Sequence, residues 1–127
     1  MKSLRLNITI DKPVEDVFAY ATDSNNISNW YPSIKEEIPS RIPVNLGARL
    51  KNRGDDLDDW SEYEFTEFEK NKVFTLSQIG SPYHVRYTFT DSGDDTTEME
   101  YYEWVNTGEL EEPASIKNLE LLKKCLE

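Results

Sequence analysis

Four consecutive segments between residues 60 and 106 have the residue pattern of β-strands separated by short turns. In the clearest, 83–90, polar residues alternate with Tyr83, Val85, Tyr87 and Phe89. A period of two places one set of side chains on the buried face of a sheet. The other three segments are 60–69, 73–79 and 96–106, and the intervening turns are rich in Gly, Pro, Asp and Asn. We therefore predict an antiparallel meander.

Other elements flank the meander on both sides. Before it, an alternating strand at 4–10 precedes two short helices, whose apolar residues are Val14, Val17, Phe18, Ala21, Ile27, Trp30 and Ile34. Residues 35–57 are the least regular, because Pro39 and Pro43 block pairing in a central strand, and only 48–51 suggests a strand. After the meander, a helix capped at Ser115 carries Ile116, Leu119, Leu121, Leu122, Cys125 and Leu126. This order predicts an α+β fold with the helices on one side of the sheet.

The strong negative charge excludes several partners. There are 14 Lys and Arg residues against 25 Asp and Glu, a net charge of −11, and such a surface repels nucleic-acid phosphates and anionic lipid headgroups. The sequence has no apolar run long enough for a signal peptide or for membrane insertion. Its single cysteine, Cys125, allows no internal disulfide. We expect a cytoplasmic protein with one domain over residues 1–127, and the oligomeric state stays open.

Five motifs follow one another along the whole chain: Ile8 to Phe18, Thr22 to Pro32, Leu46 to Arg49, the Tyr87 to Thr96 hairpin, and the Leu-rich ending Asn118 to Lys123. In their order and spacing they resemble the START/Bet v 1-like (SRPBCC) superfamily, especially its polyketide cyclase/dehydratase-type branch. The resemblance implies a helix-grip fold, in which a curved antiparallel sheet surrounds a C-terminal helix, with two short helices after the first strand.

The same resemblance implies a cavity between the sheet and the C-terminal helix. Two features depart from the family pattern. Asp95 stands where the family often has Gly in the hairpin, and the 15 residues from Pro113 to Glu127 allow only about 22 Å of helix. Such a short helix either leaves the cavity more open or fills it with its own side chains.

Aromatic residues on the predicted inner face of the sheet are the candidate cavity lining. An apolar wall with a few hydroxyl groups suits a small apolar or amphipathic molecule. Trp30 either closes one end of the cavity or anchors its helix to the sheet. The competing interpretation is that the same side chains only pack a core. The predicted ligand-binding residues are Trp30, Tyr63, Phe65, Tyr83, Tyr87, Phe89, Met99, Tyr101, Leu119 and Leu122.

The sequence gives no clear sign of catalytic or metal chemistry. His84 is the only histidine, and its register places it on the outer face of its strand, so no nucleophile–base pair can be built inside. The acidic clusters at 55–59, 91–95 and 109–112 lack the spacing of a calcium loop and are predicted to be solvated turns. No metal site and no cofactor are predicted.

Three functions remain open from the sequence. The first is binding of a small hydrophobic or amphipathic molecule, such as a lipid, polyketide or isoprenoid-like compound. The second is a polyketide cyclase/dehydratase-type enzyme, which requires an inward tyrosine or carboxylate, with the strand residues Glu64, Glu67, Glu98 and Glu100 as candidates. The third is a protein-interaction domain with a collapsed cavity, whose acidic exterior meets a basic partner.

Overall fold

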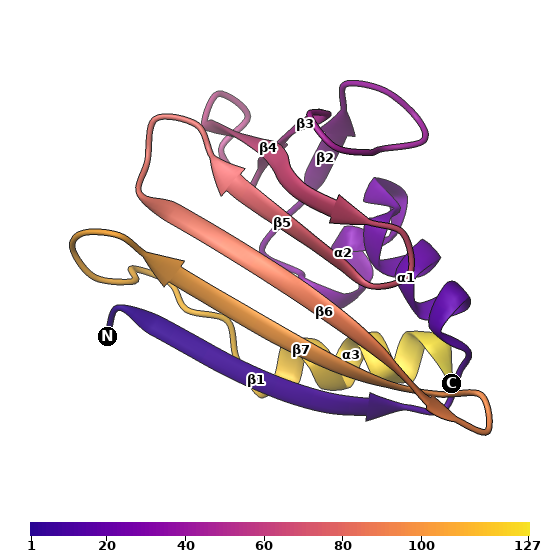
Figure 1. Cartoon of the computed structure of the whole chain (residues 1–127). Helices are drawn as coiled ribbons and strands as arrows, with labels where there is room; N and C mark the ends of the chain where they lie inside the picture. The colour runs from indigo at the N-terminus through magenta and orange to yellow at the C-terminus, as the bar shows by residue number, and fades with distance from the viewer.

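The fold is built on one seven-stranded antiparallel sheet with the strand order β1-β7-β6-β5-β4-β3-β2, seen in a computed structural model that describes residues 1–127 (Figure 1). The strands are β1 Ser3–Ile10, β2 Glu36–Pro39, β3 Arg49–Arg53, β4 Trp60–Glu69, β5 Val73–Gln78, β6 Tyr83–Gly93 and β7 Thr96–Val105. The helices are α1 Val14–Thr22, the 3-10 turn η1 Ser24–Asn26, α2 Ile27–Trp30 and α3 Ile116–Leu126. The predicted helix-grip α+β class is confirmed.

Strands β4 to β7 form the predicted meander. Their turns use backbone conformations that suit short hairpins: Asn71 has a φ of 64°, and Asp94 and Asp95 have φ values of 54° and 56°. Short polar side chains tolerate this left-handed region better than bulky ones. β6 extends to Gly93, three residues beyond the predicted strand, because a register shift between Asp91 and Gly93 carries the pairing with β7 into the turn.

The region predicted to be irregular contains one strand that the sequence did not suggest. β2 pairs with β3 at the edge of the sheet, with Glu37 opposite Asn52. Pro39 is the last residue of β2. An edge strand tolerates proline because one side of its backbone needs no partner, so the proline argument excluded a central strand but not this one.

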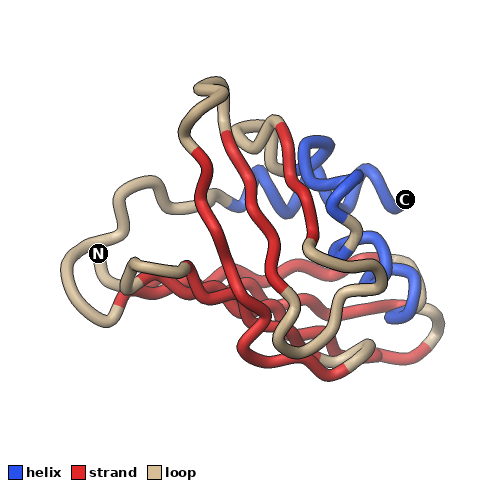
Figure 2. The backbone as a smooth tube through the Cα atoms, turned by 90° about the horizontal axis from the view of Figure 1, so that it is seen from above, coloured by secondary structure: helices blue, strands red, loops and turns tan.

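The helices gather on one side of the strongly curved sheet (Figure 2). α1 begins after Pro13, which stands at the N-cap and, as a proline, supplies no side-chain cap hydrogen bond. α3 begins at the predicted Ser115, whose hydroxyl accepts from the Lys117 backbone N–H at 3.0 Å. α3 lies against α2 and β1.

The apolar core occupies the end of the sheet that α1 and α3 cover. On α3 only Leu119 and Leu122 are buried, whereas Leu121 and Cys125 are exposed, so the buried stripe is narrower than predicted. On α1, Phe18 meets the rings of Phe68, Phe74 and Phe89 edge to face. These contacts fix α1 over one half of the inner sheet face.

Candidate functional site: a polar-lined cavity

The other half of the inner sheet face forms one wall of a cavity of about 780 Å³. Residues from β2 to β7 supply its wall, and α2 and the segment 107–112 enclose it on the other side. α3 contributes no residue to the lining, so the cavity lies beside the C-terminal helix rather than beneath it. The short helix therefore leaves a cavity open, and the collapsed cavity considered from the sequence is not found.

Six of the ten predicted ligand-binding residues line this cavity: Trp30, Tyr63, Phe65, Tyr83, Tyr87 and Tyr101. The other four are buried in the core at the far end of the same strands or on α3: Phe89, Met99, Leu119 and Leu122. Alternation along a strand predicts which face a side chain occupies, but it does not predict which end of that face the helices cover. A ligand-binding role for the six residues stays a prediction.

Glu103 on β7 organises a buried hydrogen-bond network next to the cavity. Its side chain is 1% exposed, and its Oε2 accepts from the hydroxyl groups of Tyr83 at 2.7 Å and Tyr101 at 2.6 Å. Its Oε1 accepts from the Ala114 backbone N–H at 2.9 Å. Burial raises the pKa of Tyr83, and the charge of Glu103 raises it further. Glu103 thus fixes two cavity tyrosines and ties β7 to the segment that precedes α3.

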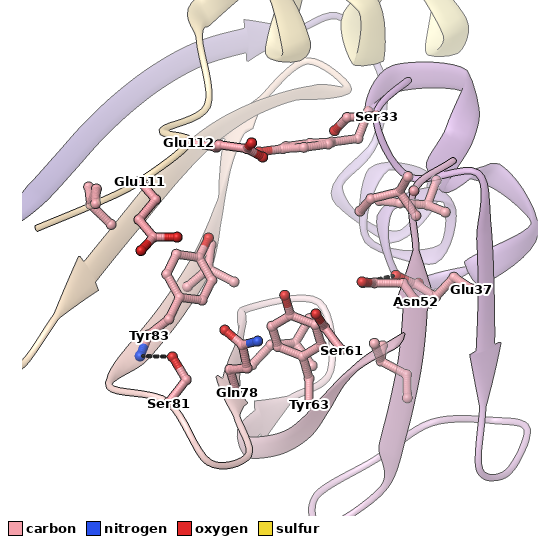
Figure 3. Close-up of a pocket in the computed structure, with 18 of the residues that line it drawn as sticks. Ser33, Glu37, Asn52, Ser61, Tyr63, Gln78, Ser81, Tyr83, Glu111 and Glu112 are labelled. Carbon is pink, nitrogen blue, oxygen red and sulfur yellow. Dashed lines mark hydrogen bonds between the residues drawn. The ribbon is translucent and has the colours of Figure 1, made fainter. Parts of the chain in front are cut away.

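Glu37 on β2 lines the cavity opposite this network (Figure 3). Its carboxylate accepts from the Ser24 hydroxyl at 2.8 Å and from the Asn52 side-chain amide at 3.2 Å. Burial raises the pKa of Glu37, whereas these two hydrogen bonds oppose the rise. It is therefore a carboxyl group, positioned at the cavity wall, that holds a proton more readily than an exposed one.

The four glutamates that the sequence suggested as inward acids all point away from the cavity. Each makes an interaction on the outer face of the sheet: Glu64 with Arg49 at 3.7 Å, Glu67 with Arg86 at 3.1 Å, Glu98 with Thr9 at 2.6 Å, and Glu100 with Arg5 at 2.6 Å. Alternation gives the reason, because these glutamates alternate along their strands with residues on the inner face, among them Phe65, Met99 and Tyr101. The acids that face inward are Glu37 and Glu103. The inward position of Glu103 could have been predicted from the sequence, because Glu103 lies two residues from both Tyr101 and Val105 on the same face of its strand.

Replacing Glu37 with glutamine is expected to change the pH dependence of folding. Burial raises the folded-state pKa of Glu37 above its ordinary value of 4.5. The protonated carboxyl group therefore stabilises the folded state below the unfolded-state pKa, and this stabilisation is lost as the pH rises through the folded-state pKa. The Glu37→Gln protein should therefore gain stability relative to wild type from pH 4.5 upward. Urea unfolding across this range measures the gain, with Glu64→Gln as the control for removing one charge. The prediction is contradicted if the free energies of unfolding of wild type and Glu37→Gln differ by the same amount at both ends of the pH range.

Trp30 anchors α2 and closes one side of the cavity. It is 1% exposed, its ring lies edge to face against Tyr31 and Tyr87, and its carbonyl accepts from the Asn118 side chain at 3.2 Å. Its Nε1 is buried without a hydrogen-bond partner.

Burial raises the pKa of the cavity residue Tyr63 to about 12, so this hydroxyl keeps its proton across the ordinary pH range.

The charges that line the cavity are mostly negative. Five carboxylates stand against the single guanidinium of Arg53: those of Glu37, Asp59, Glu109, Glu111 and Glu112. The Arg53 guanidinium already donates to a Glu36 carboxylate oxygen and to the Gly54 carbonyl, both at 2.9 Å. Figure 3 shows Glu37 across the cavity from Glu111, with Tyr63, Gln78 and Tyr83 on the sheet between them.

The outer face of the sheet holds His84, as its register predicts. The His84 ring stacks on Trp104 at 4.9 Å between centroids, and its Nδ1 lies 2.7 Å from the Ser77 hydroxyl. Burial lowers the pKa of His84. No three His, Cys, Asp or Glu side chains gather as a metal-binding group would, and no helix combines the length and apolar character needed to cross a membrane.

A curved antiparallel sheet, helices on one side and a cavity between them define the class of helix-grip proteins. A family model described as "Polyketide cyclase / dehydrase and lipid transport" matches residues 1–125, so the chain belongs to that family. A search of curated proteins gave no match.

Solved structures share the fold at low sequence identity. XoxI from Bacillus cereus is 16% identical with a TM-score of 0.74, covering 99% of this chain and 96% of its own. CalU16 from Micromonospora echinospora is 22% identical with a TM-score of 0.63, covering 83% of this chain and 61% of its own. The di-domain ARO/CYC protein BexL, from the BE-7585A biosynthetic pathway, is 12% identical with a TM-score of 0.66, covering 83% of this chain and 36% of its own. This chain therefore spans less than two thirds of CalU16 and of BexL.

Proposed function

We propose that the protein binds a small hydrophobic or amphipathic molecule in the cavity between β2 to β7, α2 and the segment 107–112. The observation that carries this proposal is the cavity itself: its volume of about 780 Å³ falls within the roughly 300–1,000 Å³ typical of small-molecule sites. Membership of a family described by cyclase, dehydrase and lipid-transport activities supports the same conclusion.

The lining suits a ligand with both apolar and polar parts. Phe65, Phe74 and Leu76 supply apolar surface, while Tyr63, Gln78 and other polar side chains supply hydrogen-bonding groups. Apolar surface drives entry of the ligand, and a few fixed polar groups orient it. The Glu103 network holds two of the tyrosines in one position before any ligand arrives, which lowers the cost of ordering on binding.

A cyclase or dehydrase reaction is the second candidate, and Glu37 is the observation that favours it. General acid–base catalysis needs a carboxyl group with a raised pKa within reach of the bound molecule. Glu37 lines the cavity, and burial raises its pKa. The structural relationship to the ARO/CYC protein BexL is compatible with this chemistry. If the protein is such an enzyme, the Glu37→Gln variant should still bind the substrate but should no longer convert it.

Binding is tested by titrating the protein with Nile red, an uncharged apolar dye that fluoresces in apolar surroundings. We expect saturable binding of one dye per chain. Gln78 points into the cavity between Tyr63 and Tyr83 (Figure 3), so Gln78→Trp should weaken dye binding by about tenfold or more. Ile79→Trp is the matched control. Ile79 is the next residue along the chain, but it is 44% exposed and lies outside the cavity lining.

Should Gln78→Trp fail to fold, as judged by circular dichroism, Ser61→Trp introduces the same ring at another point of the cavity wall (Figure 3). The proposal is wrong if the wild-type protein binds no dye. It is also wrong if both tryptophan variants in the lining bind dye as well as Ile79→Trp does.

A further inference from the structure

We infer that the ligand presents hydrogen-bond donors, such as hydroxyl or ammonium groups, to the cavity, and that carboxylate or phosphate ligands bind more weakly. This inference rests on the proposed function and narrows it to a chemical class. It is carried by the arrangement of charges and protons around the cavity.

The first observation is that the cavity lining holds one cation against five carboxylates. Arg53 is the only positively charged side chain in the lining, and its guanidinium is already held by Glu36 and Gly54. Glu37 and Glu112, in contrast, both line the space. An anionic ligand would leave water to meet a single guanidinium whose charge Glu36 already balances, and the surrounding carboxylates would repel it.

The second observation is the direction of the tyrosine hydrogen bonds. A phenolic hydroxyl has one proton to donate, and Tyr83 and Tyr101 both donate theirs to Glu103 Oε2. Both side chains also line the cavity. Their oxygens can therefore only accept a hydrogen bond from a bound molecule, which must supply the proton.

The third observation is the unused capacity of Glu37. A carboxylate can accept about four hydrogen bonds, and Glu37 accepts two, from Ser24 and Asn52. Its remaining lone pairs belong to a side chain that lines the cavity opposite the tyrosines (Figure 3). Acceptors thus stand on two sides of the same space, and a molecule with donor groups at two positions matches both.

Three probes that share one ring system test the inference: 2-naphthol, 2-naphthylmethylamine and 2-naphthoate, each competing with Nile red at about pH 8, where carboxylates are ionised. We expect the alcohol and the amine to displace the dye at roughly tenfold lower concentrations than the carboxylate. Repeating the competition at higher salt removes long-range repulsion from the net charge of −11, and the order of the probes should remain.

The variant Glu37→Gln should narrow the preference of the cavity for the amine over the carboxylate. Glu64→Gln removes the same charge from the outer face of the sheet and should leave that preference unchanged. If Nile red binds but 2-naphthoate displaces it as well as 2-naphthol does, this inference is overturned while the proposed function stands. It is also overturned if the two variants change the preference equally. If Nile red does not bind at all, the proposed function itself fails.

Discussion

Replacing Glu103 with alanine is expected to lower the free energy of unfolding by about 3–5 kcal/mol. The substitution leaves the hydroxyls of Tyr83 and Tyr101 and the backbone N–H of Ala114 without their acceptor in a buried region. Each buried donor without a partner costs roughly 1–3 kcal/mol. Because domains are stable by only about 5–15 kcal/mol, this loss removes a large part of the total stability. Urea denaturation followed by circular dichroism measures the loss.

Glu100→Ala supplies the matched control for Glu103→Ala. Glu100 lies on the same strand, but it faces outward and pairs with a half-exposed Arg5. Exposed ion pairs contribute about 0–1 kcal/mol, so this control should unfold near the wild-type urea concentration. Glu103→Gln, which keeps one carbonyl acceptor, should fall between the two. A Glu103→Ala protein as stable as the Glu100→Ala protein would contradict the role given to this network.

Replacing Phe74 with alanine is expected to cost about 3–5 kcal/mol, the usual range for a buried phenylalanine. The Phe74 ring is 3% exposed and stacks on Tyr87 with centroids 4.5 Å apart. It also lies within 6 Å of the rings of Phe18, Phe65 and Phe89. Phe74 therefore joins the core beneath α1 to the wall of the cavity.

Thermal and urea unfolding both report the effect of Phe74→Ala. Leu57→Ala is the control for removing an apolar side chain, because Leu57 is 69% exposed in a loop and its loss should change stability by no more than about 0.5 kcal/mol. A loss below about 1 kcal/mol for Phe74→Ala would mean that the aromatic cluster does not hold the two halves of the inner face together.

Much of the fold could be predicted from the sequence because local patterns determine it. The alternation at 83–90 gives β6 and its inner face, and Ser115 gives the start of α3. β2 could not be predicted in the same way. It is four residues long, it contains Pro39, and it is a strand only because β3 pairs with it. Local pattern therefore missed the element that carries Glu37.

The cavity lining was only partly predictable for a related reason. Phe89 and Tyr87 lie on the same face of one strand, yet Phe89 packs under Phe18 and Tyr87 lines the cavity. The division between them depends on where α1 crosses the sheet, which is a property of the whole fold. Glu103 differs, because its register placed it inward. It escaped notice since a glutamate among aromatic residues is ordinarily expected at the surface.

We propose that this cavity, and no other surface, receives the ligand. Backbone amide NMR spectra recorded during a titration with 2-naphthol test it most directly. Saturable shifts are expected around the cavity residues Asn52, Gln78 and Tyr83, with little change around the outer-face residues His84 and Trp104. Shifts confined to the outer face, or no shifts at ligand concentrations that fully displace Nile red, would contradict it.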